Sequence, residues 1–243
     1  MELPDAVAGE LDYVKAFGGT EQNGTPTPDT PVDIVSNNGV LKARHQSGLP
    51  IGYKLVDYIK SDASIELDKP TNDTMEFVAE FYREANNSQY IYQSDTSSSG
   101  TANTSAYVAT PGNWRFGSRA ASISVDTGIK TTSVQNVSGV WLNGEKVGTY
   151  ESMTAFTSNN NLRLFGSQVS PQIRLYSLKV YQNGAPVYDL VPCQRESDSA
   201  YGMYDLVSDQ FFTNTNATLT IGSFVSDPVV VYADGTVETI GIK

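Results

Sequence analysis

The chain has 243 residues, enough for one large β domain with additional segments or for two modest domains. Hydrophobic residues make up only 39% and charged residues 18%, while Ser, Thr, Asn and Gly are abundant, which favours strands and turns over helices. The net charge of −11 would repel a polyanion, so we expect no nucleic-acid partner.

Residues 1–48 are predicted to form a small extended module. Between Gly24 and Pro31 prolines alternate with small polar residues, and proline disfavours helix for itself and for its predecessor. A hairpin should follow, with strands at 32–35 and 40–43 around the turn Asn37-Asn38-Gly39, because Asn-Gly supplies the positive φ values of a tight turn. We expect this module to attach the chain to a larger particle or to sister chains.

Further hairpins are predicted at Asn143-Gly144, Asn183-Gly184 and Asp234-Gly235, each between two apolar runs. Hairpins repeated at these spacings indicate antiparallel sheets rather than βαβ units. Asp227-Pro228 is expected to mark the exit from the main domain, which leaves 49–226 as the main domain and 227–243 as a C-terminal linking hairpin.

The segment Met75–Glu84 is compatible with two secondary structures. A helix would place Glu76, Glu80 and Glu84 on one face, whereas a strand would place Met75, Phe77, Ala79 and Phe81 on one face. We favour the strand, because the neighbouring segments are all β and no glycine ends a helix there.

Two polar stretches are predicted to be exposed loops. Residues 95–105 consist almost entirely of Asp, Ser, Thr, Asn, Gly and Ala, and Ser158-Asn159-Asn160-Asn161 forms a second stretch of this kind. Such residues supply little apolar surface for a core, and binding groups are common on loops held by a rigid scaffold.

The span from Leu49 to Gly222 resembles the concanavalin A-like (laminin-G-like) jelly rolls of phage tail and receptor-binding proteins. The resemblance is carried by Leu49–Ile59 at the entry, Trp141–Val147 in the centre, Leu162–Gly166 followed by Ile173–Tyr181 near the end, and Asp189–Cys193 with Gly202–Asn214 at the end. The segment 17–40 separately resembles a leader found in phage tail proteins. These resemblances imply an all-β antiparallel sandwich of the concanavalin A-like type in a virion protein, while fold alone does not fix function.

Catalytic sites find little support in the sequence. Glycoside hydrolysis needs two carboxylates across a cleft, and Glu76, Glu80 and Glu84 are better explained as a solvated strand face. His45, the only histidine, lies in a linker between Arg44 and Gln46, and Cys193, the only cysteine, is better explained as a small buried residue. One His and one Cys are too few for a zinc site. We therefore expect no enzyme activity and no cofactor.

Calcium is the one metal that stays open as an alternative. Laminin-G-like relatives hold calcium between rim loops through oxygen ligands, and Asp95, Asp126, Asp198 and Asp209 are the candidates here. Loop aspartates are more often turn-formers, and no EF-hand spacing occurs.

Carbohydrate binding needs an aromatic face for sugar C–H groups with amide, carboxylate or Arg groups around it. That mixture is found near the two polar stretches, in Asp95, Asn103, Tyr107, Asn113, Trp114, Arg115, Arg119, Asn159 and Asn161. The alternative is that Trp114 packs in the core, where tryptophan is largely buried in most proteins, and that the arginines are ordinary surface residues.

Together these observations predict a phage virion protein of the tail or fibre type, made in the bacterial cytoplasm and displayed on the particle surface. Its expected partners are a host surface glycan or receptor and other virion proteins, in a homo-oligomer that we expect to be a trimer, without membrane insertion. The alternatives are a purely structural or decorating module and, less favoured, a glycan hydrolase.

Overall fold

A computed structural model describes residues 20–22, 25–27, 32–37, 40–45, 48–50, 52–85, 88–94, 103–166, 172–225, 229–231 and 237–239, with side chains only between 48 and 225. Every regular element in these ranges is a β-strand. Within them there is no helix long and apolar enough to cross a membrane. The chain forms two compact units, one from Val56 to Ser223 and the other from the described residues on either side of it.

The flanking unit contains three short antiparallel pairs and the strand β5 (Tyr53–Leu55). The pairs are β1 (Thr20–Gln22) with β2 (Thr25–Thr27), β3 (Val32–Asn37) with β4 (Val40–His45), and β22 (Val229–Val231) with β23 (Val237–Thr239). The predicted N-terminal and C-terminal hairpins are thereby confirmed, while the predicted domain boundaries at 48/49 and 226/227 stay predictions.

The unit from Val56 to Ser223 is a sandwich of two antiparallel sheets. The first sheet has the strand order β12-β11-β10-β9-β16-β7. Its strands are β7 (Ile65–Asn72), β9 (Gln89–Gln93), β10 (Asn103–Val108), β11 (Gly112–Gly117), β12 (Arg119–Ile123) and β16 (Thr157–Leu164).

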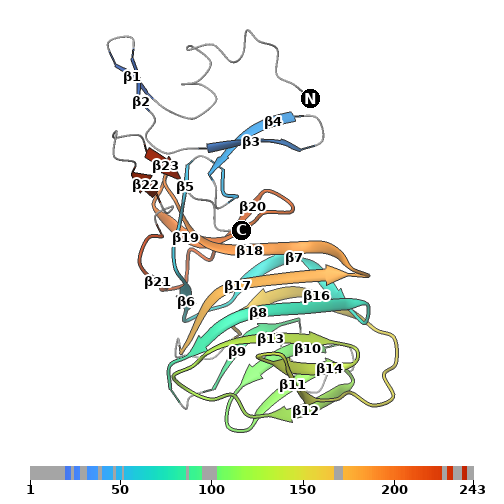
Figure 1. The fold of residues 1–243 in the computed structure, drawn as a ribbon. Coiled ribbons are helices and arrows are strands. Elements are labelled where there is room, and N and C mark those ends of the chain that lie inside the picture. Colours follow the sequence, from blue (N-terminus) through green and yellow to red (C-terminus); the bar gives the residue numbers. More distant parts are fainter. Residues whose placement is uncertain are drawn as a thin grey trace. The chain divides into compact units, whose positions relative to one another are not determined.

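The second sheet has the main order β15-β14-β13-β8-β17-β18-β19-β20. Its strands are β8 (Met75–Arg83), β13 (Lys130–Asn136), β14 (Gly139–Leu142), β15 (Glu145–Gly148), β17 (Ile173–Gln182), β18 (Ala185–Arg195), β19 (Ala200–Asp205) and β20 (Gln210–Phe212). The short strand β6 (Ile59–Ser61) pairs with β17 and with β21 (Leu219–Ile221). The chain passes repeatedly between the two sheets, as in a jelly roll (Figure 1). The predicted all-β antiparallel sandwich of jelly-roll type is confirmed.

The core lies between the sheets and follows from the alternation of side chains along each strand. In β8 every second residue from Met75 to Phe81 is buried, which confirms the strand interpretation of this segment. The ring of Phe77 stacks at 5.0 Å on the ring of Tyr92 from the first sheet, so the two layers touch directly. Burying each such side chain contributes about 1.5–3 kcal/mol.

A polar network also joins the two layers. Gln135 of the second sheet accepts a hydrogen bond from the Tyr92 hydroxyl at 2.6 Å and donates to the Tyr150 hydroxyl at 2.6 Å. The same amide donates to the backbone oxygen of Arg115 in β11 at 2.8 Å. These contacts fix the first sheet against the second at the strand that carries Arg115.

Two of the predicted tight turns have the expected geometry. Asn143 and Gly144, between β14 and β15, have φ values of 50° and 86°. Asn183 and Gly184, between β17 and β18, have φ values of 51° and 81°. Both residues of each turn are in the left-handed region, which is the requirement that makes Asn-Gly a strong hairpin signal.

The two predicted polar loops are wrong where the structure describes them. Residues 103–105 are buried at the start of β10, and 158–161 lie inside β16, while 95–102 lie outside the described residues. Hydrogen bonds explain why polar residues form strands here: Ser158 Oγ donates to the backbone oxygen of Ser94, and Ser94 Oγ accepts from the backbone N–H of Thr104.

Candidate ligand-binding face

The first sheet has an outer face, made of the side chains that point away from the second sheet. Strand register places two rows of residues across it. The first row runs from β7 to β12 through Glu66, Arg163, Gln93, Ser105, Arg115 and Ala120. The second row runs from β9 to β12 through Tyr90, Tyr107, Asn113 and Ser122. The outer face therefore combines aromatic, amide, hydroxyl and guanidinium groups.

Two tyrosines form the aromatic part of the outer face. The rings of Tyr90 and Tyr107 lie 4.7 Å apart with a tilt of 48°, and both side chains are half-buried. Burial raises the pKa of Tyr90, as does its neighbour Tyr107, while the positive charge of Arg115 acts in the opposite direction. The Tyr90 hydroxyl therefore stays protonated at neutral pH and lies within electrostatic reach of Arg115.

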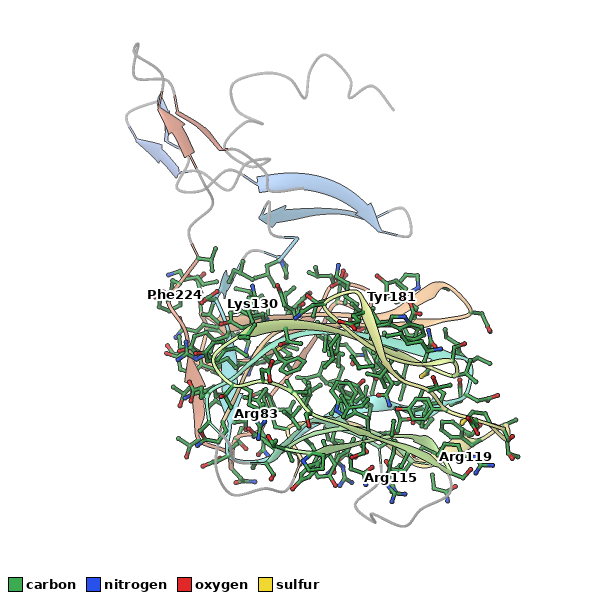
Figure 2. The ribbon with its side chains drawn as sticks, turned by 60° about the horizontal axis from the view of Figure 1, so that its bottom comes forward. Arg83, Arg115, Arg119, Lys130, Tyr181 and Phe224 are labelled. Atoms are coloured by element: carbon green, nitrogen blue, oxygen red, sulfur yellow. The ribbon has the colours of Figure 1, made fainter. Side chains whose placement is uncertain are left out.

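Arg115 is the cationic group beside this pair. Its backbone is held by the Gln135 amide, as described above, and its side chain points away from the sandwich on the side opposite Lys130 and Tyr181 (Figure 2). Within the described residues the Arg115 guanidinium has no hydrogen bond and no ion pair. It is thus available to an external acceptor.

Gly166 passes close to Tyr90 of this pair and to Gln93. A Cβ atom at this position would lie 2.5 Å from Tyr90 Cδ2 and 2.9 Å from Gln93 Cδ. Real Cβ atoms do not approach other atoms so closely, so the backbone at Gly166 packs directly on the two side chains. This contact helps to hold Tyr90 in place.

The position of Trp114 corrects one of the ligand-binding residues predicted from the sequence. Its side chain is 0% exposed, lies opposite Ala106 and Ala121, and belongs to the core, so its assignment as a ligand-binding residue is wrong and the core alternative is right. The physical reason is alternation along β11, where Asn113 and Arg115 point outward and Trp114 and Phe116 point inward.

The other predicted residues divide into three groups. Tyr107, Asn113 and Arg115 come together on the outer face, and Asn159 and Asn161 lie on the same face along β16. Asn103 also belongs to β10 but is only 2% exposed, so it cannot contact a ligand directly as predicted. Asp95 lies outside the described residues.

Arg119 is the second correction. It lies opposite Phe116, so its side chain is on the other side of the sheet from that of Arg115. The Arg119 guanidinium donates to the backbone oxygen of Ser152 at 3.0 and 3.2 Å. Arg115 therefore belongs to the outer face, whereas Arg119 does not. Figure 2 shows the two arginines at separate places along the sheet.

Sequence reasoning missed Tyr90 and Arg163, and also Gln93, which lies in the same row but is only 3% exposed and supports the face rather than contacting a ligand. Their place on the outer face follows from the pairing of β9 with β10 and β16, which joins segments far apart in the chain. The only local signal was the strand-like run Gln89–Gln93, and it does not say which face its residues occupy because β9 contains a bulge at Ile91.

The acidic residues considered for hydrolysis have local partners. Glu80 forms an ion pair with Lys130 at 2.9 Å, and Glu76 accepts a hydrogen bond from Asn136 at 2.8 Å. Burial would raise the pKa of Glu84, but hydrogen bonds from Arg174 and Lys60 outweigh burial and hold that pKa below its usual value. Glu84 is therefore kept ionised, which does not suit a general acid.

The calcium candidates that the structure describes, Asp126, Asp198 and Asp209, do not form a cluster. Asp198 is paired with Arg195 at 2.6 Å, which lowers the pKa of its carboxyl to about 2, and Asp209 accepts from the Tyr204 hydroxyl at 3.4 Å. Asp126 is exposed, and Asp95 is not among the described residues. In the described ranges no three His, Cys, Asp or Glu side chains gather as a metal site would require.

Cys193 is buried in β18, and burial raises the pKa of its thiol to about 12. At pH 8 only about one thiol in ten thousand would then be ionised, and the thiolate is the reactive form. We expect iodoacetamide to leave Cys193 unmodified in the folded protein and to alkylate it fully in denaturant, as measured by mass spectrometry. Rapid alkylation of the folded protein would contradict the buried placement.

No family model matches the chain, and neither does any curated protein or any solved structure. The case for a function therefore comes from the outer face and from the sequence features described above.

Proposed function

We propose that this chain is a phage virion protein of the tail or fibre type, whose sandwich binds a host-surface glycan through the outer face of the first sheet. The observation that carries the proposal is the half-buried Tyr90–Tyr107 pair with Asn113 and Arg115 beside it. The virion assignment is supported by the resemblances at Leu49–Gly222 and 17–40 and agrees with the jelly-roll sandwich.

The chemistry of the outer face suits a sugar. Aromatic rings offer apolar faces to sugar C–H groups, while amide and guanidinium groups donate hydrogen bonds to hydroxyl and ring oxygens. The groups stand on paired strands rather than on loops, and a scaffold of strands holds such groups in defined positions. A rigid, preformed face reduces the ordering cost of binding.

The tyrosine rings are only half-buried, and we expect modest binding at a single site. A single site of this kind is expected to bind with a dissociation constant on the order of millimolar to micromolar. A homotrimer on a multicopy particle would raise the avidity by about a hundredfold or more if the spacing of the copies fits the surface. Analytical ultracentrifugation of the full chain would test the trimer.

Tyr107→Ala is expected to abolish most glycan binding, with a loss of affinity of about tenfold or more, because central aromatic residues dominate such contacts. The measurement is a glycan array with the full chain, followed by titration against the best ligand. Tyr181→Ala is the matched control, since Tyr181 lies half-buried on the outward side of the second sheet (Figure 2).

Three results would speak against the proposal. Equal binding by Tyr107→Ala and the parent would remove the outer face from recognition. A parent chain that binds no glycan on the array or on host cells would instead favour a purely structural virion module. Release of sugars from host polysaccharide would favour a hydrolase.

A further inference from the structure

We propose that the outer face selects an acidic glycan, one that carries carboxylate groups, through Arg115 and Arg163. This inference rests on the proposed glycan-binding function and adds the class of sugar. It is carried by the position of the two guanidinium groups within one cross-strand row and by the weak or missing compensation of their charges.

Of the two arginines, Arg115 gives the stronger support for an acidic ligand. Its guanidinium has no acidic partner in the described part of the chain, although the protein as a whole carries a net charge of −11. An arginine left without a carboxylate beside two tyrosines presents a planar fork of donors next to apolar ring faces. A uronic acid has the matching groups, a carboxylate for the fork and a sugar ring for the aromatic faces.

Arg163 supplies a second positive charge on the same row. Its nearest acidic contact is Glu66, with 3.8 Å between Nε and Oε2, and the Glu66 side chain is 58% exposed. A contact of 3.8 Å to a carboxylate that is mostly in solvent contributes little, so Glu66 compensates Arg163 only weakly. The Nε atom itself is buried and makes no hydrogen bond.

The spacing of the two arginines suggests a ligand longer than one sugar. Arg163 is on β16 and Arg115 on β11, with Gln93 of β9 and Ser105 of β10 between them. Three strand spacings place the two backbones roughly 14 Å apart. A chain with repeated carboxylates could therefore meet both arginines, whereas Gln93 and Ser105, which are 3% and 1% exposed, would not touch it.

The acidic character of the rest of the protein does not prevent this. The acids in the strands of the first sheet are Glu66, which is the first member of the row, and Asp68, both on the edge strand β7. Asp68 accepts from the Tyr188 hydroxyl and lies 3.8 Å from the Lys69 ammonium. Charges further away are screened within about 8 Å at physiological ionic strength. The local positive charge therefore decides which ligand is favoured at the face.

The test compares two forms of one polymer, oligogalacturonate and its fully methyl-esterified form, which differ in charge but share the same sugar backbone. We expect the full chain to bind the acidic form at least tenfold more tightly, and added NaCl to weaken that binding. Arg115→Gln should lose about tenfold or more in affinity for the acidic form, and Arg163→Gln should lose less. Both variants should lose much less affinity for the ester than for the acidic form, because the ester has no carboxylates for the guanidinium groups.

Two further variants separate local geometry from general charge. Arg115→Lys keeps the charge but not the planar fork, so it should restore only part of the affinity. Lys146→Gln removes one positive charge from β15, in the second sheet, and should leave binding unchanged. A loss of the same size in Lys146→Gln would mean that net charge alone is responsible and would overturn the inference.

The outcomes also separate this inference from the proposed function. If the parent binds both polymers equally and Arg115→Gln has no effect, the acidic class is wrong, while a loss in Tyr107→Ala would still support glycan binding at the outer face. If Tyr107→Ala has no effect on any glycan bound, the proposed site itself fails.

Discussion

Trp114→Ala is expected to lower the free energy of unfolding by about 3–5 kcal/mol, the range found for large aromatic residues removed from cores. The Trp114 side chain is fully buried between the sheets, and its neighbours across the strands are Ala106 and Ala121, which are too small to fill the space that it would leave. A loss of this size is a large part of the total stability of most domains. Urea unfolding of the full chain, followed by circular dichroism, measures it.

The second tryptophan provides the matched control. Trp141 is half-buried in β14, with the Lys146 ammonium 5.0 Å from its ring centre, so Trp141→Ala should cost about 1 kcal/mol or less. One result would contradict the placement of Trp114 in the core. If Trp114→Ala folds with nearly the stability of the parent but no longer binds glycan, the indole ring faces the ligand.

The contrast between the two tryptophans shows what the sequence could and could not predict. Local signals worked well, because a hairpin is defined by the turn residues and by alternation within neighbouring segments. Asn143-Gly144 and Asn183-Gly184 were found in this way, and so was the strand at Met75–Arg83. These signals depend on residues close together in the chain, and they were enough to predict the fold class.

The orientation of side chains in the first sheet was harder to predict. Alternation says that Asn113 and Arg115 share one face and Trp114 faces the other, but not which face is covered by the second sheet. That depends on pairing between distant strands, such as β9 with β16. Polar composition was misleading for the same reason: the buried Ser94 hydroxyl accepts from the backbone N–H of Thr104, and the buried Ser158 hydroxyl donates to the backbone oxygen of Ser94.

Gln135→Leu is expected to destabilise the sandwich by several kcal/mol, although leucine is apolar and similar in size. The Gln135 amide is fully buried and is the shared partner of the Tyr92 and Tyr150 hydroxyls and of the Arg115 backbone oxygen. Each buried polar group that loses its partner costs about 1–3 kcal/mol. Burial raises the pKa of both tyrosines, so both hydroxyls stay protonated. Without Gln135 the Tyr92 hydroxyl loses its acceptor, and the Tyr150 oxygen and the Arg115 carbonyl lose a donor.

A double variant tests whether orphaned hydroxyls are the cause. In Gln135→Leu with Tyr92→Phe the Tyr92 hydroxyl is gone, so the loss should be about 1–3 kcal/mol smaller than the sum of the two single losses. Urea unfolding of the parent, both single variants and the double variant gives this difference. Strictly additive losses would show that Gln135 stabilises the sandwich through packing and not through the hydrogen bond to Tyr92. If the losses are not additive, the stability still lost in the double variant comes from the other two hydrogen bonds of Gln135, to the Tyr150 hydroxyl and to the backbone oxygen of Arg115 in β11.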